Sequence, residues 1–67
     1  MSVASVSEII AMSTESFDDA LNQGVARAHK TLKNVRSVWI NDQSVDIEKG
    51  KIVAYKLSLK VTFVLID

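Results

Sequence analysis

The sequence contains no cysteine and no proline, only two glycines and a single histidine. The absence of cysteine excludes disulfides and thiolate metal sites. Because the glycines stand alone at positions 24 and 50, the sequence has no glycine-rich phosphate-binding loop. The one histidine, His29, falls outside the apolar stripe of its predicted helix, so we interpret it as a solvated or interfacial residue and not as a catalytic or metal-binding one. We therefore expect that the protein is not an enzyme.

An excess of charge of one sign is also missing. Eight basic residues balance eight acidic ones, and no long run of either sign follows the chain, so we expect no nucleic-acid partner. The first residues lack the charged and apolar regions of a secretory signal, and no stretch approaches the roughly 18 apolar residues that a membrane span requires. We expect a soluble, cytoplasmic protein that has no membrane partner.

The length of 67 residues is enough for one small domain, which we expect to occupy residues 1–67. A domain of this size buries only about 60% of the surface that its unfolded chain exposes. Chains this short are commonly stabilised by disulfides, a metal or partner subunits. Because disulfides are excluded, self-association is the leading expectation.

Apolar residues predict three strands. From Ser2 to Met12 the even positions Val6, Ile10 and Met12 are apolar, which predicts a strand with these residues on its inner face. A second strand is predicted over residues 35–47, a glycine-containing turn over 48–51, and a third strand over 52–66. Six consecutive odd positions of the third strand are apolar and share one face: Tyr55, Leu57, Leu59, Val61, Phe63 and Leu65.

Between the first two strands the apolar residues recur every three or four positions, which predicts a helix from Phe17 to residue 32 or 33. Ser16 is a good N-cap, and Asn34 is the predicted C-cap. Gly24 lies in the apolar stripe, where the missing side chain allows the sheet to approach closely. The predicted order is therefore β-α-β-β.

One helix covers only one face of a sheet, and the third strand is longer than the helix. We therefore predict an α+β subunit in which a three-stranded antiparallel sheet is partly wrapped around one helix. Part of such a sheet projects beyond the helix, and an uncovered sheet surface of this kind usually packs against other subunits of the same protein. The predicted assembly is a closed homo-oligomer.

The only tryptophan, Trp39, falls on the opposite face of its strand from Val38 and Ile40. A large aromatic side chain placed away from the core is expected to be buried by another subunit or by a ligand. Neutral hydrogen-bonding residues are predicted to share its face: Ser37, Asn41 and Gln43. This mixture suits a small aromatic ligand, and the alternative is that Trp39 packs in a subunit interface.

Two groups of carboxylates are candidates for chemistry. Asp42, Asp46 and Glu48 lie near the predicted hairpin and supply oxygen ligands for Ca²⁺ or Mg²⁺, although their spacing is not that of a calcium loop. The alternative is that they are solvated hairpin charges. The adjacent Asp18 and Asp19 point about 100° apart on the helix, so we interpret them as partners of the helix dipole and not as an acid/base pair.

Three segments, residues 13–17, 26–36 and 50–65, closely resemble the dodecins in sequence and in spacing. The similarity covers nearly the whole chain, in the same β-α-β-β order. The resemblance implies a non-enzymatic protein that assembles into a hollow homododecamer and stores or sequesters a small ligand. In many dodecins this ligand is a flavin, riboflavin or FMN, held as stacked pairs between symmetry-related tryptophans. A flavin-free cage with a structural or calcium-binding role is the alternative.

This chain departs from the dodecin pattern at two positions. The stacking tryptophan of flavin-binding dodecins comes three residues after the asparagine that matches Asn34, where this chain has Ser37. The glutamine that bonds the flavin edge follows the tyrosine that matches Tyr55, where this chain has Lys56. Trp39 lies about 6.5 to 7 Å further along the strand than Ser37, so a ligand stacked on Trp39 would be displaced by that distance and the flavin pocket would be changed.

Overall fold

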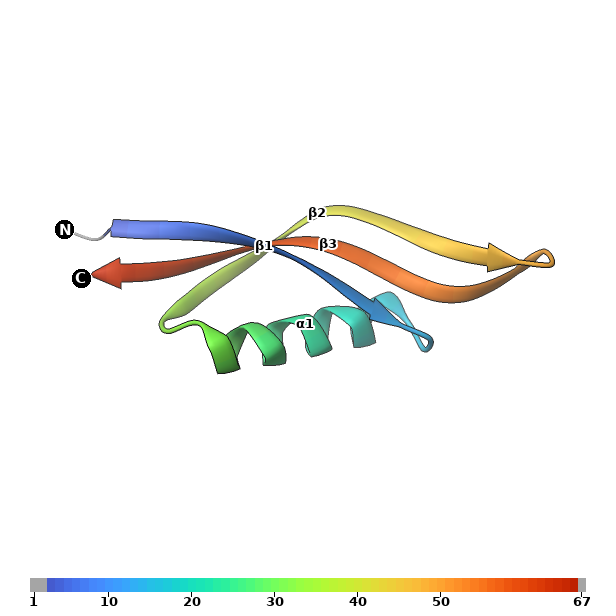
Figure 1. The fold of residues 1–67 in the computed structure, drawn as a ribbon, viewed down its shortest axis with the longest axis horizontal. Coiled ribbons are helices and arrows are strands. Elements are labelled where there is room, and N and C mark those ends of the chain that lie inside the picture. The colour runs from blue at the N-terminus through green and yellow to red at the C-terminus, as the bar shows by residue number, and fades with distance from the viewer. Residues whose placement is uncertain (1–2, 67) are drawn as a thin grey trace.

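The computed structural model describes residues 3–66 and confirms the predicted element order. The elements are β1 (Val3–Ser13), α1 (Phe17–Thr31), β2 (Val35–Glu48) and β3 (Lys51–Ile66). They form an antiparallel sheet in the order β1-β3-β2, with α1 packed on one of its faces (Figure 1). Ser2, the predicted first residue of the first strand, lies outside the described residues. The fold is the α+β subunit that the sequence predicts.

The helix begins as predicted and ends slightly earlier. The Ser16 hydroxyl accepts a hydrogen bond from the Asp19 backbone N–H at 2.9 Å and so caps the first turn. At the other end Leu32, and not the predicted Asn34, is the C-cap, and its N–H bonds the Ala28 carbonyl. Asn34 instead adopts a left-handed conformation, with φ of 59°, in the turn into β2. Its carbonyl accepts the backbone N–H of Val64, which fixes the turn against β3.

The core lies between α1 and the central strand. Leu57, Leu59 and Val61 of β3 are almost fully buried, as their period of two predicts. Small residues of the helix, Ala20 and Gly24 among them, pack over this strand. Because Gly24 has no side chain, Leu59 approaches so closely that a methyl group at position 24 would lie 2.8 Å from its Cδ1 atom.

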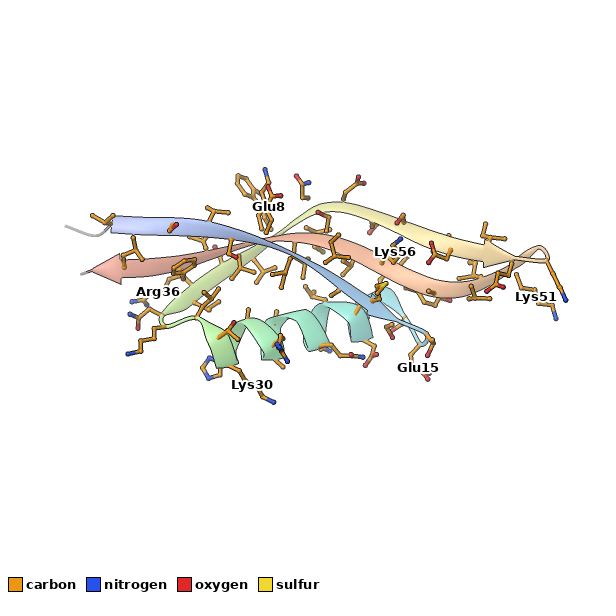
Figure 2. All side chains as sticks on the ribbon, in the orientation of Figure 1. Glu8, Glu15, Lys30, Arg36, Lys51 and Lys56 are labelled. Atoms are coloured by element: carbon orange, nitrogen blue, oxygen red, sulfur yellow. The ribbon has the colours of Figure 1, made fainter. Side chains whose placement is uncertain are left out.

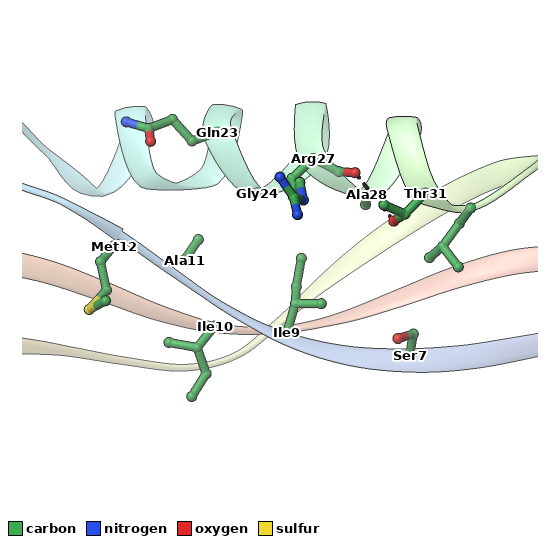
Figure 3. A pocket seen from close by; sticks show the side chains of 11 residues that line it. Ser7, Ile9, Ile10, Ala11, Met12, Gln23, Gly24, Arg27, Ala28 and Thr31 are labelled. Carbon is green, nitrogen blue, oxygen red and sulfur yellow. Dashed lines mark hydrogen bonds between the residues drawn. The ribbon is translucent and has the colours of Figure 1, made fainter.

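The predicted inner face of β1 is wrong. Val6, Ile10 and Met12 are 53%, 70% and 58% exposed and lie on the side of the sheet away from α1. Ile9 and Ala11 point toward the helix instead, as Figure 3 shows. The reason is steric: opposite Gly24 the sheet and helix backbones are close, and the small Ala11 fits this contact. Val6, Ile10 and Met12, which alternate with these residues, are left on the uncovered face.

The β2–β3 hairpin projects beyond the helix, as predicted from the strand length. It gives the subunit an elongated shape, with extents of 51 × 18 × 14 Å (Figure 1). Its turn contains two residues with positive φ, Lys49 at 52° and Gly50 at 76°. Two such residues match the right-handed twist of the flanking strands. Near the turn, Ile47 and Ile52 are exposed on a part of the sheet that α1 does not cover.

Candidate ligand-binding face

The face of the sheet away from α1, called the outer face below, brings side chains of three strands together. In Figure 2, Glu8 of β1 points away from the helix and marks this face. The strand register assigns the other members. They are Val6, Ile10 and Met12 on β1, Lys56, Ser58, Lys60 and Thr62 on β3, and Ser37, Trp39, Asp42 and Ser44 on β2.

Trp39 is the largest exposed side chain of the outer face. It is 68% exposed and sits opposite Lys60, with Glu8 on the far side of Lys60 in the same row. A hollow of about 390 Å³, bordered also by Ser37 and Thr62, adjoins Trp39 on one side. A smaller hollow of about 150 Å³, bordered by Asn41 and Lys60, adjoins it on the other side. The predicted position of Trp39 away from the core is confirmed.

A β-bulge in β2 changes which residues accompany Trp39. Ile40 pairs with Leu59 and Asp42 with the next residue, Ser58, so Asn41 is an extra residue in β2. Beyond the bulge Asp42 takes the outer face, and Gln43 lies opposite Leu57 on the helix side. The expectation that Gln43 shares a face with Trp39 is therefore wrong. The alternation of residue types along β2 gives no signal of the bulge, which depends on the pairing with β3.

Two lysines of the central strand β3 lie along the middle of the outer face. The Lys60 ammonium lies 4.0 Å from the Glu8 carboxylate, and the Lys56 ammonium lies 3.5 Å from Asp46. All four side chains are partly or largely exposed, so each pair contributes little to stability. The lysines are thus able to exchange these partners for a ligand at small cost.

Lys56 borders a third hollow, of about 100 Å³, on the outer face. Polar residues of the paired strands β2 and β3 border it together with one apolar residue of β1, and of these residues Gln43 has its side chain on the helix side. Its lining residues are Ile10, Asp42, Gln43, Ser44, Lys56 and Ser58. The hollow therefore combines an ammonium group, two hydroxyl groups and one carboxylate.

The three predicted metal ligands of the hairpin do not converge in one subunit. Asp42 accepts the backbone N–H of Gln43 at 2.9 Å, and Asp46 pairs with Lys56. Glu48 is exposed and lies opposite Lys51 at the turn. Within residues 3–66 no group of three or more histidine, cysteine, aspartate or glutamate side chains is placed to hold a metal ion. A cation site built from these residues would need a second subunit.

The helix carboxylates have structural contacts. Asp19 accepts hydrogen bonds from the Ser13 hydroxyl and from the Gln23 side chain, the latter at 2.6 Å. Ser13 is buried, and its hydroxyl oxygen also accepts the Glu15 backbone N–H. These contacts join the end of β1 to the first turn of α1. Asp18 and His29 are exposed on the helix, away from the outer face.

An open groove that no sequence pattern predicts lies between α1 and the edge strand β1. It has a volume of about 410 Å³, and Figure 3 shows the side chains that line it. Ile9, Ala11 and Ala28 are among its lining residues, and within residues 3–66 Arg27 is the only charged residue that lines it. The groove thus offers an apolar surface beside an unpaired strand edge and no reactive group.

Among residues 3–66, no helix has the length and hydropathy needed to cross a membrane.

Comparisons with known proteins agree with this geometry. The sequence profile of the family described as Dodecin matches residues 3–66. The solved dodecin of Streptomyces davaonensis is 27% identical, with a TM-score of 0.91 over 98% of this chain and 97% of that one. A variant of the Thermus thermophilus dodecin is 25% identical, with a TM-score of 0.91 over 100% of both chains.

A third similar solved structure is that of a calcium-chelating protein. It is the calcium dodecin of Mycobacterium tuberculosis, described as a calcium-chelating antigen with a novel calcium-binding site. It is 31% identical to this chain, with a TM-score of 0.80 over 91% of this chain and 87% of that one. The comparison with curated protein sequences gives no match.

Proposed function

The chain belongs to the dodecin family. We propose that it is a non-enzymatic protein that assembles into a hollow homododecamer. In this proposal the subunits sequester a flavin on the outer face of the sheet, the face away from α1. Flavin binding is typical of this family. The observation that carries the proposal is the exposed indole ring of Trp39, which stands between two hollows on a sheet face that no part of the described subunit covers.

Self-assembly is supported by the apolar side chains of the outer face. Val6, Ile10, Met12 and Trp39 are all more than half exposed in the single subunit. Exposed apolar side chains gathered on one surface are unusual for a monomer and mark an interaction surface. A small chain without disulfides is also commonly stabilised by partner subunits. Copies that cover one another's outer faces satisfy both requirements.

The residues near Trp39 fit a planar ligand. A flat ring that occupies the hollow over Ser37 stacks against the indole of Trp39, and the hydroxyls of Ser37 and Thr62 supply hydrogen bonds. Asn41 borders the hollow on the opposite side of Trp39. In this proposal the ligand stacks on Trp39, which lies two residues beyond Ser37 along β2.

Fluorescence titration tests the proposal. Trp39 is the only tryptophan, so the tryptophan emission of the protein reports on this site alone. We expect that riboflavin added to the purified oligomer quenches both flavin and Trp39 emission, with a saturable stoichiometry. Trp39→Phe should weaken binding, whereas Val25→Ala, at a partly exposed helix position, serves as the control. The absence of quenching at micromolar flavin would refute the flavin function.

A calcium-binding cage is the second candidate, favoured by the 31% identity to a dodecin described as calcium-chelating. Asp42, Asp46 and Glu48 supply hard oxygen ligands, and symmetry-related copies would have to complete the site. If calcium binds only to the assembled state, a chelator lowers the thermal stability of the oligomer through linkage. An unchanged melting temperature after chelation and after calcium addition would exclude this candidate.

A further inference from the structure

We infer that the groove between α1 and β1 receives the β2–β3 hairpin of a second copy of the chain, with Arg27 of the groove paired to Glu48 of the hairpin. The inference rests on the proposed self-assembly, to which it adds a second contact between subunits. This contact lies at the α1–β1 edge of the subunit and is separate from the stacking of outer faces.

The outer face by itself does not build a large closed assembly. Two copies that cover each other's outer faces use the same surface on both subunits, and such a contact joins two subunits and no more. A larger closed assembly therefore needs a second contact, made between two different surfaces of the chain. A projection that enters a groove is a contact of this kind, and it closes into a ring when the rotation between copies allows it.

The groove has the character of a protein contact surface. Its volume is about 410 Å³, and its lining includes the apolar residues Ile9, Ala11 and Ala28. One wall is β1, an edge strand of the sheet that residues 3–66 form. Within this strand Glu8 is the only charged residue and proline is absent, so β1 has few of the features that keep an edge strand from meeting other chains. An extended protein segment is therefore the occupant that the groove favours.

The β2–β3 hairpin is such a segment, and it carries exposed apolar side chains. Ile47 and Ile52 pair with each other near the turn and are 62% and 52% exposed in the single subunit. Their burial in the groove would remove apolar surface from water on both partners, which favours association. The hairpin extends beyond the end of α1 and away from the groove of its own subunit (Figure 1). Only a second copy is therefore able to place its hairpin in this groove.

The charges of the two surfaces are complementary. Among the groove residues that the structure describes, Arg27 alone is charged, and its side chain extends from α1 toward β1 (Figure 3). Glu48 directly follows Ile47 on the hairpin and is exposed. Within residues 3–66 neither side chain has an ion-pair partner. Opposite charges on two surfaces steer their encounter and fix their register. The turn lysines, Lys49 and Lys51, would repel Arg27, so the strands and not the turn lie beside it.

Charge reversal tests this contact, with light scattering at equal subunit concentrations as the measurement. Arg27→Glu alone and Glu48→Arg alone each bring like charges together and should convert the dodecamer into dimers, which the outer faces hold. Added salt should restore part of the assembly, because salt screens the repulsion. The double variant, Arg27→Glu with Glu48→Arg, should regain the wild-type size. Lys30→Glu reverses a charge on the same helix outside the groove lining and should leave the size unchanged.

Ile47→Lys is a second test, because it leaves both members of the proposed ion pair in place. A lysine at this position puts a charge into the apolar groove and should also give dimers. Arg27, Ile47 and Glu48 are all exposed in the single subunit, so these substitutions leave its core unchanged. An Ile47→Lys protein of wild-type size would show that the groove holds another occupant, such as a small apolar molecule, or none.

The outcomes separate the inference from the proposal on which it rests. If both single charge reversals keep the wild-type size, or if the double variant stays dissociated, the pairing of hairpin and groove is overturned while self-assembly still stands. If the wild-type protein is itself a monomer or a dimer, the proposed dodecamer fails instead.

Discussion

Replacing Gly24 by alanine should destabilise the protein, although alanine is the better helix former. A methyl group at this position would lie 2.8 Å from the Leu59 Cδ1 atom and 3.1 Å from the Ala11 Cβ atom. Leu59 is fully buried and Ala11 nearly so, so a shift of either side chain disturbs the packed core. Overpacking of this kind costs about 1–3 kcal/mol, and the gain in helix propensity offsets at most about 1 kcal/mol. With the full offset, the expected net loss is about 0–2 kcal/mol.

Chemical denaturation of wild type and Gly24→Ala, at equal subunit concentrations, measures this loss. Equal concentrations are needed because the stability of an oligomer depends on subunit concentration. The matched control is Ala26→Gly at an exposed position of the same helix, which should cost about 1 kcal/mol through propensity alone. A Gly24→Ala protein that is more stable than wild type would refute the reasoning, since propensity would then outweigh the contact with β3.

Three further substitutions test other parts of the structure. Ser16→Ala removes the hydroxyl that caps α1 and should cost about 1 kcal/mol in denaturation, whereas Ser16→Asp should retain most of the stability; equal losses would contradict the capping role. Gly50→Ala should cost about 1 kcal/mol through its positive φ alone, because no atom lies within 4 Å of the added methyl group, and Gly50→Asn should cost less. Ile10→Lys places a charge on the outer face and should convert the oligomer into smaller species, as measured by light scattering. Val25→Lys on the helix is the control. An intact dodecamer of the Ile10→Lys protein would show that this face is not an interface.

The candidate site illustrates how far sequence patterns reach. The position of Trp39 away from the core follows from the apolar residues on either side of it, and the structure agrees. Its neighbours do not follow in the same way. One extra residue, Asn41, places Asp42 on the outer face, where strict alternation predicts Gln43. The hollow beside Lys56 is lined by residues of β1, β3 and β2, which lie side by side only in the folded sheet.

The sequence by itself determined the β-α-β-β order, the start of the helix at Phe17 after the N-cap Ser16, the glycine turn and the buried face of β3. Each of these is set by local propensity or by one uninterrupted period, which a single chain segment displays. Only the tertiary structure decided which face of β1 meets the helix and where the β2 register shifts. In β1 both faces contain apolar residues, so the choice depends on the close contact of Ala11 with Gly24, two residues brought together by folding.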